Sequence, residues 1–283
     1  MKVSWIVPCW NGEKYLQSFL DCVAAQTWRP LELIFVDDGS TDNTSAIFSQ
    51  MQPVLEGAGI TAIYCAVPHG GQAAAMNAGL ARMTGDFLTW SDADDFLLPR
   101  AVEAKVRFLL DNPDYAMVRH DAWNYEDGIL KGRVCRPEHI GLEDVFSSLF
   151  RETLYCYAGC YMMRKELFYA SYPDGQIPVS QEGQNLQMLL PPASRTRCGW
   201  LDEALMIYRI HHSSHAHHQR SLPEMVARAQ EFYKLRLQLL PFCQCDQDTY
   251  RKEAEQIFNQ FKKNMLKQAS YLYKAKKIQE KQI

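Results

Sequence analysis

Short continuous apolar runs alternate with stretches of helical periodicity through the first 120 residues. The continuous runs lie at 3–7, 31–36, 60–66 and 87–90, and their length and their β-branched or aromatic residues are typical of buried strands. Between the first two runs, apolar residues recur at the spacing of one helical face, at Tyr15, Leu16, Phe19, Leu20, Val23 and Ala24. Further helices are predicted over 45–51, over 73–82, and from Pro99 to about Asn112. Strands that alternate with helices predict a parallel sheet covered by helices on both faces.

The pattern changes after residue 120. Residues 124–132 predict a hairpin that turns at Asp127 and Gly128, and strands are expected at 156–164 and 204–210 with a helix over 183–190 between them. From Ser221 onward the periodicity is helical, over 223–240 and then from about Asp248 to Lys281. We therefore expect an α/β fold with a mainly parallel, Rossmann-like sheet over residues 1–220 and a helical C-terminal extension over 221–283.

Four polar loops each follow a predicted strand. They are "PCWNGE" (8–13), "DDGS" (37–40), "HGGQ" (69–72) and "SDADD" (91–95). Ligands of parallel sheets bind beyond the carboxyl ends of the strands, so all four loops are expected at one edge of the sheet. Gly70 and Gly71 stand at a helix start, where the backbone can approach a ligand closely and N–H groups can meet an anion.

The loop at 91–95 holds three carboxylates, Asp92, Asp94 and Asp95. Like charges this close repel each other, and such an arrangement usually exists to hold a cation or to divide acid and base roles. The alternative is an acidic turn that caps the following helix, and we assign Asp95 to this capping role. Hard oxygen ligands select Mg²⁺ or Mn²⁺, which keep positions open for phosphate oxygens.

Composition narrows the class of protein. Hydrophobic content of 47%, charged content of 22% and a net charge of −3 give no indication of disorder or of a nucleic-acid-binding protein. Nine scattered cysteines without paired CxxC motifs are typical of core thiols in a reducing compartment. The apolar runs fall short of the roughly 20 residues of a membrane span, and a secretory signal pattern is lacking. The sequence therefore predicts a cytoplasmic protein.

The charge is divided unevenly along the chain. From Ser221 to the end there are twelve Lys and Arg against seven Asp and Glu, which gives +5 and leaves −8 for the rest. This basic helical tail could pack on the body, form a homodimer, or lie at the inner face of a membrane.

The stretches "VSWIVPCWNGEKYL", "QTWRPLELIFVDDGSTDNT", "GGQAAAMNAGLARMTGDFLTWSDADD" and "YRIHHSS" together resemble the inverting family-2 glycosyltransferases with a GT-A fold. The resemblance runs over residues 3–215, with residues 1–100 as the nucleotide-binding half and 101–220 as the acceptor half. It implies a nucleotide-diphospho-sugar donor, commonly a UDP-sugar, and a divalent metal. It also implies transfer to a saccharide or lipid-linked saccharide acceptor, commonly in bacterial surface polysaccharide or glycoconjugate synthesis.

The resemblance also implies site residues. The donor side comprises Pro8, Asn11, Glu13, Asp38, Gly71, Asn77, Asp92 and Arg209, with Asp38 accepting from the base. Asp94 is the main ligand of Mn²⁺ or Mg²⁺, Asp92 lies near the ribose and the metal, and His211 completes the metal shell.

Inversion requires a general base, which in this family is a carboxylate ahead of a helix. One alignment of "VSQEGQNLQMLLPPA" makes Glu182 the base, whereas a shifted one places Gln184 and Asn185 there, and amides cannot take the proton. We expect Glu182 to be the base, with Asp174 as the substitute. Two other functions stay open: a catalytically silent sugar-nucleotide-binding module, and a sugar-phosphate nucleotidyltransferase, although "PCWNGEK" is not the Gly-rich basic loop that the latter needs.

Overall fold

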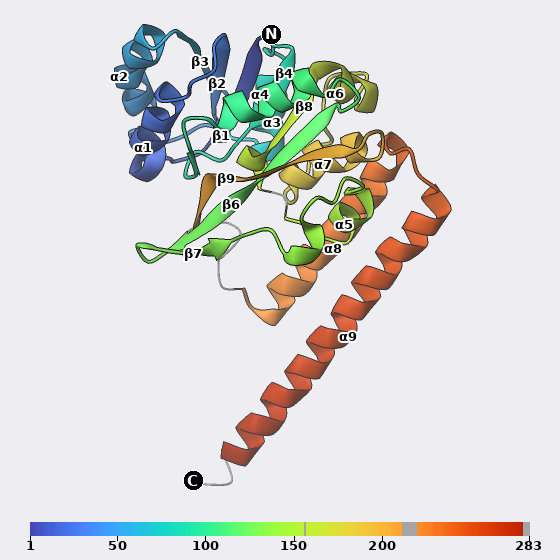
Figure 1. The fold of residues 1–283 in the computed structure, drawn as a ribbon. Coiled ribbons are helices and arrows are strands. Elements are labelled where there is room, and N and C mark those ends of the chain that lie inside the picture. The colour runs from blue at the N-terminus through green and yellow to red at the C-terminus, as the bar shows by residue number, and fades with distance from the viewer. Residues whose placement is uncertain (156, 211–219, 280–283) are drawn as a thin grey trace.

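The first hundred residues build the parallel half of the sheet. The computed structural model describes residues 1–155, 157–210 and 220–279, with side chains through Lys267. Four strands run parallel, namely β1 (Val3–Cys9), β2 (Leu31–Asp37), β3 (Ile60–Ala66) and β4 (Phe87–Trp90). They are connected by α1 (Glu13–Ala24), α2 (Thr44–Gly57) and α3 (Gln72–Leu80) (Figure 1). Every residue of β1 and β2 is buried, as expected for strands covered on both faces, so the predicted alternation is confirmed here.

Beyond β4 the sheet becomes mixed. In the order β3-β2-β1-β4-β8-β6-β9-β5, strand β8 (Tyr161–Arg164) is antiparallel to β4 and to β6 (Met117–Glu126). β9 (Cys198–Ile210) is parallel to β6, whereas β5 (Phe96–Leu97) is antiparallel to β9, and β7 (Ile129–Arg133) forms the predicted hairpin with β6. Parallel pairing needs a long crossover connection. Between β6 and β8 the described residues form β7 and only short helical segments rather than a crossover helix, which is consistent with the reversed direction of β8.

The longer helices of the second half match their predicted positions, and the short ones were not predicted. The former are α4 (Ala101–Asp111), α7 (Gln184–Ala193), α8 (Leu222–Leu239) and α9 (Gln247–Gln279). The latter are α5 (Phe146–Phe150), α6 (Lys165–Ser171) and 3₁₀ turns at Pro137–His139, Ala158–Cys160 and Leu240–Phe242. One or two turns are too short to show a helical period. In the first half, α2 continues to Gly57 rather than ending at residue 51, although it contains Pro53.

The strand predicted over 156–164 is shorter than expected. It begins only at Tyr161, because the residues before it form a 3₁₀ turn around Gly159. A Cβ on Gly159 would lie 2.9 Å from both Leu97 Cδ1 and Met206 Sδ, so a larger residue in this turn would require these side chains to shift.

Lys105 on α4 is wholly buried beneath this turn, and it supplies a test of stability against pH. Its Nζ donates to the carbonyl oxygen of Gly159 at 2.6 Å and to Thr89 Oγ1 at 3.3 Å. Burial lowers the pKa of Lys105 from 10.5 to about 7. Between these two pH values the unfolded chain holds a proton that the folded chain has lost, so the free energy of unfolding rises with pH.

We expect the free energy of unfolding of the wild type, relative to Lys105→Met, to rise between pH 7.5 and 9 by up to about 1.4 kcal/mol per pH unit. Urea unfolding at several pH values measures this difference. Lys131→Met on the exposed hairpin strand β7 is the matched control and should follow the wild type. If the wild type and Lys105→Met gave parallel curves, the lowered pKa of Lys105 would be wrong.

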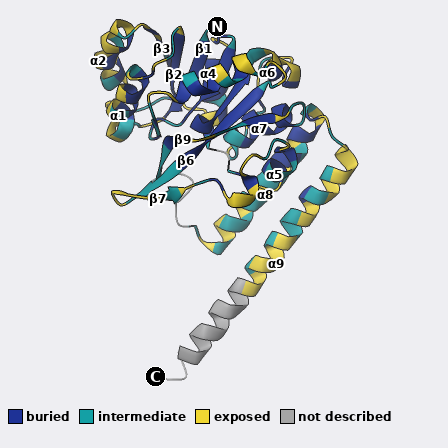
Figure 2. Ribbon diagram, viewed as in Figure 1, coloured by how far each residue is buried: buried dark blue, intermediate teal, exposed yellow. Residues whose placement is uncertain are grey.

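The C-terminal helices stand apart from the sheet. Figure 1 shows α8 against the body and α9 returning past it and extending away, and Figure 2 shows the part of α9 through Lys267 as mostly exposed or partly exposed. In the part of the chain that the structure describes, no helix is both long enough and apolar enough to cross a membrane. The eight described cysteines are free thiols, and all but Cys245 are buried, in agreement with the prediction of core thiols.

Candidate functional site

Hydrogen bonds join the loops after β1 and β2. The backbone N–H of Thr41 donates to Asn11 Oδ1 at 2.8 Å, and that of Asn43 donates to Glu13 Oε2 at 3.0 Å. The backbone N–H of Asp38 donates to the carbonyl oxygen of Cys9 at 2.8 Å. Asn11 and Glu13 therefore fix the loop after β2, and any contact of theirs with a nucleotide stays a prediction.

Asp38 joins the loop after β2 to the loop after β3. It is 3% exposed, and its two carboxylate oxygens accept from the backbone N–H groups of Gly70 at 2.8 Å and Gly71 at 2.9 Å. Beside this junction the ring of Trp10 stacks on His69, with centroids 4.7 Å apart. Trp10 is 56% exposed, so the edge presents a flat aromatic surface to solvent.

Gly71, the N-cap residue of α3, has a backbone conformation that residues with a side chain rarely adopt. Its φ of 87° and ψ of 167° lie in a region occupied almost only by glycine. No described atom lies within 4 Å of where its Cβ would be, so the space above it is open to a ligand. Gly71→Ala should lower the free energy of unfolding by about 1–3 kcal/mol through backbone strain.

Urea unfolding tests this expectation against a matched control. Gly57→Ala, at the end of α2, also places a Cβ with no described neighbour within 4 Å, but at an ordinary φ. It should stabilise the chain by up to about 1 kcal/mol. Equal effects of the two substitutions would contradict the argument from strain.

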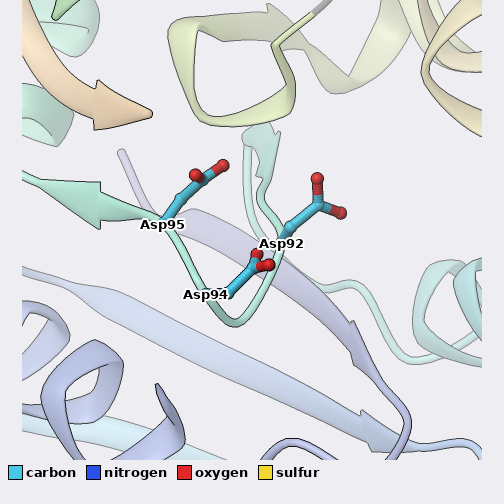
Figure 3. A group of neighbouring side chains, drawn as sticks. All are labelled: Asp92, Asp94 and Asp95. Atoms are coloured by element: carbon cyan, nitrogen blue, oxygen red, sulfur yellow. The ribbon is translucent and has the colours of Figure 1, made fainter. Parts of the chain in front are cut away.

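The loop after β4 brings three carboxylates together, and we call Asp92, Asp94 and Asp95 the acidic triad. One oxygen of each lies within 4.8 Å of the others, and the group is the single such cluster among the described residues (Figure 3). Gln72, in the first turn of α3, donates from Nε2 to Asp92 Oδ1 at 2.7 Å, which joins this loop to the one after β3. All four loops thus meet at one edge of the sheet, as predicted.

The capping role predicted for Asp95 is wrong. Asp95 precedes strand β5, and α4 begins only at Ala101 with Arg100 as its N-cap residue. Asp95 is 2% exposed, and its Oδ1 accepts from the backbone N–H of Arg209 on β9 at 3.4 Å. Its side chain therefore faces the other two carboxylates and belongs to the triad.

The electrostatics of the triad favour a bound cation. Burial, followed by repulsion from Asp94, raises the pKa of Asp92 to about 7, although the hydrogen bond from Gln72 opposes the rise. Burial and the same repulsion, from Asp94 and Asp92, hold the pKa of Asp95 well above 3.8. Ligand oxygens across one Mg²⁺ lie about 4.2 Å apart, so small side-chain rotations would bring the triad into one metal shell. The donor set therefore fits Mg²⁺ or Mn²⁺.

Arg209 closes the site from β9. Its guanidinium carbon lies 4.6 Å from the ring centroid of Tyr15 and 4.9 Å from that of Phe96, so the side chain is held between two aromatic rings. Its backbone N–H donates to Asp95 Oδ1. Arg209 therefore brings a positively charged side chain close to the triad. His211, two residues further on, lies outside the described residues, and so do His215, His217 and His218.

Comparison with known proteins assigns the family. A family model described as glycosyl transferase family 2 matches residues 4–171, more than half of the chain. The chain belongs to glycosyl transferase family 2. The match spans β1 to α6, so it contains all four loops of the site and ends before α7, α8 and α9.

Curated glycosyltransferases match less than half of the chain. Glycosyltransferase GlyA of Streptococcus pneumoniae is 32% identical over 132 residues, which is 45% of this chain and 18% of the relative. An uncharacterized glycosyltransferase of Rickettsia typhi is 34% identical over 114 residues, 40% of this chain and 34% of the relative. The chain thus matches 18% and 34% of the length of these relatives.

Solved structures share the fold over most of the chain. TarS 1–349 of S. aureus in complex with UDP-GlcNAc has a TM-score of 0.65 at 18% identity, covering 92% of this chain and 71% of that one. A mannosyltransferase of Pyrobaculum calidifontis in complex with GDP-Man and Mn²⁺ has a TM-score of 0.61 at 18% identity, covering 90% and 69%. These likenesses confirm the GT-A fold for this family-2 chain.

The residue predicted as the base lies in an ion pair. Glu182 precedes α7, and its Oε2 accepts from Arg228 Nε on α8 at 3.0 Å. Asn185, in the first turn of α7, accepts from Trp90 Nε1 at the end of β4 at 3.0 Å, so α7 begins close to the loop of the triad. Asp174 is exposed in the turn after α6.

Two polar side chains lie near this helix. Asn77 Nδ2 donates to the carbonyl oxygen of Ile177 and Asn77 Oδ1 accepts from the backbone N–H of Ile177, at 2.9 Å each, so Asn77 fixes the loop before α7, and its place on the donor side stays a prediction. The side chain of Gln184 is 4% exposed, and its amide has no hydrogen-bond partner among the described residues.

Sequence reasoning missed several residues of the site. Gln72 touches the triad directly, and the rings of Tyr157 and Tyr208 stack with centroids 3.9 Å apart. Burial, Tyr157 and then the negative charges of the triad raise the pKa of Tyr208. An aromatic pair separated by 51 residues leaves no local pattern in a sequence.

Proposed function

We propose that this family-2 chain is an inverting glycosyltransferase that moves one sugar from a UDP-sugar to an acceptor hydroxyl, with Mn²⁺ or Mg²⁺ at the acidic triad. The observation that carries the proposal is the convergence of three carboxylates at the edge where Gly71 leaves the backbone open. Neighbouring folds support the donor, since a glucosyl-3-phosphoglycerate synthase of Mycobacterium tuberculosis, in complex with Mn²⁺, UDP and glucosyl-3-phosphoglycerate, has a TM-score of 0.52.

Residues of this chain would hold the donor and orient it. Asp94 and Asp92 would ligate the cation, Asp95 would add a third carboxylate, and His211 is proposed as a further ligand. When bound, the cation supplies Lewis-acid stabilisation of the departing diphosphate, a contribution on the order of several kcal/mol. Arg209, held between two rings, adds a positive charge on the same side.

The nucleotide would lie along the loops of β1, β2 and β3, over Pro8, Asn11, Glu13, Asp38 and Gly71. Asp38 Oδ1 accepts one backbone N–H and has a second lone pair that could accept from the base, whereas Oδ2 lies 2.9 Å from His69 Nδ1 in addition to its bond from Gly71. This assignment makes residues 1–100 the nucleotide-binding half and 101–220 the acceptor half.

Transfer needs one proton acceptor. The acceptor hydroxyl oxygen forms a bond to the anomeric carbon, the bond from that carbon to the diphosphate oxygen breaks with its electron pair, and the hydroxyl proton passes to Glu182. Glu182 is 14% exposed at its side chain and lies at the N-terminal end of α7, which Asn185 ties to the end of β4. This position, together with its carboxylate, supports the choice of Glu182.

We further propose a saccharide or lipid-linked saccharide acceptor of a bacterial surface polysaccharide pathway, with the chain acting in the cytoplasm or at the inner face of the membrane. The bacterial origin of the curated relatives supports the bacterial setting alone. The basic α9 would serve as the membrane contact or as a dimer contact. Liposome sedimentation of the full chain tests the membrane contact. The comparison is a variant in which Lys262, Lys263 and Lys267 are all changed to Gln.

A thermal-shift screen of UDP-, GDP- and dTDP-sugars, each with Mn²⁺ or with EDTA, tests the donor class. Binding to the native state alone stabilises it by about 2.7 kcal/mol at a hundredfold excess over Kd. We expect a UDP-sugar to raise the melting temperature only when Mn²⁺ is present. Stabilisation by a GDP-sugar or dTDP-sugar instead would reject the UDP assignment, and a shift that survives EDTA would reject the metal.

A second candidate is a silent sugar-nucleotide-binding module, and one observation favours it: the Glu182 carboxylate is engaged in an ion pair with Arg228. Release of UDP from the selected donor distinguishes the two functions. A silent module would bind the donor but release no UDP from it.

A further inference from the structure

His69 lies against Asp38 at the donor edge of the sheet. Its Nδ1 is 2.9 Å from Asp38 Oδ2 and 3.0 Å from the backbone carbonyl oxygen of Asp38. Both neighbours are acceptors, because a backbone carbonyl and an ionised carboxylate have no proton to donate. Nδ1 therefore carries a proton of the imidazole ring and donates it to Asp38.

The position of His69 is fixed from two sides. The ring of Trp10 stacks on it with centroids 4.7 Å apart and an interplanar angle of 25°. Gly39, with a φ of 72°, approaches so closely that a Cβ on it would lie 2.8 Å from the backbone nitrogen of His69. These contacts hold the imidazole at Asp38, although the side chain of His69 is 52% exposed.

The hydrogen bonds of Asp38 leave its two carboxylate oxygens unequal. Oδ2 accepts from the backbone N–H of Gly71 at 2.9 Å and from His69, and these two donors use both of its lone pairs. Oδ1 accepts from the backbone N–H of Gly70 at 2.8 Å, and no second donor to it is recorded among the described residues. One acceptor position therefore remains on a side chain that is 4% exposed.

We propose that His69 is a specificity-determining residue, which restricts Asp38 to a base with a single N–H donor, such as uracil, and disfavours guanine. The inference rests on the proposed function, in which Asp38 accepts from the base. The Watson–Crick edge of uracil presents one N–H between two carbonyl groups, whereas that of guanine presents a ring N–H beside an amino group. Guanine pairs fully with a carboxylate only through both oxygens, and His69 helps to saturate one of them. One guanine donor then stays unpaired, which lowers the affinity for guanine relative to uracil.

Titration calorimetry of the full chain with UDP and with GDP, each in the presence of Mn²⁺, tests this role of His69. We expect the wild type to bind UDP at least about tenfold more tightly than GDP. His69→Phe keeps a ring against Trp10 but removes the donor, so Oδ2 gains a free lone pair on a buried carboxylate. The affinity for GDP should then rise about tenfold, the lower end for one hydrogen bond to a charged group, while that for UDP changes by less than about threefold.

Two further variants separate the lost donor from general effects. His69→Asn keeps an N–H donor on a short side chain, so it should restore the wild-type preference for UDP. Thr27→Val is the matched control, because Thr27 Oγ1 also donates to a carbonyl oxygen and a carboxylate oxygen, those of Pro99 and Glu103. Thr27 precedes β2 and lies outside the four loops, so both nucleotide affinities should stay unchanged.

The possible results distinguish this role of His69 from the proposed function. If the wild type binds UDP and His69→Phe keeps the wild-type ratio of UDP to GDP affinity, the role of His69 is wrong and the donor assignment stands. Binding of neither nucleotide to the wild type would reject the proposed function and the role of His69 together. If His69→Phe does not fold, His69→Ala removes the same donor and is judged by the same ratio.

Discussion

Asp94→Asn should reduce UDP release from the selected donor at least about 10³-fold, which corresponds to roughly 4 kcal/mol of barrier. The amide keeps the shape of the side chain but removes the charge that attracts the cation, and a Lewis acid of this kind contributes several kcal/mol. Fixed-time assays with saturating Mn²⁺ measure the loss. The same change removes one of three mutually repelling carboxylates, so the melting temperature should stay the same or rise, and the loss of activity would not come from unfolding.

Asp111→Asn is the matched control for this substitution. Asp111 is exposed at the end of α4, outside the four loops, so the variant should release UDP at the wild-type rate. The thermal shift with donor and Mn²⁺ gives an independent readout, because Asp94→Asn should abolish the part that depends on Mn²⁺. Activity within about tenfold of the wild type, roughly 1.4 kcal/mol, would falsify the metal-site assignment.

The donor edge could be predicted because its determinants are local in sequence. Each loop directly follows an apolar run, and parallel strands bring their carboxyl ends to one edge whatever the details of packing. Prediction of the strand that ends at Trp90 was therefore enough to place Asp92 and Asp94 at this edge. Asp95 was misassigned because β5, the element that turns its side chain inward, is two residues long and is specified by pairing with β9 more than 100 residues later.

The acceptor side was harder to predict for the same physical reason. The ion pair between Glu182 and Arg228 spans 46 residues and joins the loop before α7 to the helical extension. The stacking of Tyr157 on Tyr208 and the bonds of Asn77 to Ile177 are likewise non-local. Such contacts arise from how β9 and α8 pack on the sheet, and single-sequence periodicity carries no information on that packing.

Glu182→Gln should lower UDP release about 10²- to 10⁴-fold, the usual contribution of a positioned general base. The amide cannot take the proton of the acceptor hydroxyl or of water. The donor is proposed to bind at the loops after β1, β2, β3 and β4 rather than at Glu182, so the thermal shift with UDP-sugar and Mn²⁺ should be unchanged. This combination, lost turnover with retained binding, separates a missing base from a damaged donor site.

Two further variants decide whether the carboxylate of Glu182 acts as a base or only as a partner of Arg228. Arg228→Gln removes the ion pair but leaves the base, so it should retain most of the UDP release that Glu182→Gln loses. Glu231→Gln, which breaks the exposed pair with Lys234 on α8, is the control for a general effect of lost carboxylates and should be neutral. If Glu182→Gln kept full activity, the base would lie elsewhere, and Asp174→Asn would be the next variant. If Arg228→Gln lost as much activity as Glu182→Gln, the ion pair itself would be what orients the acceptor side.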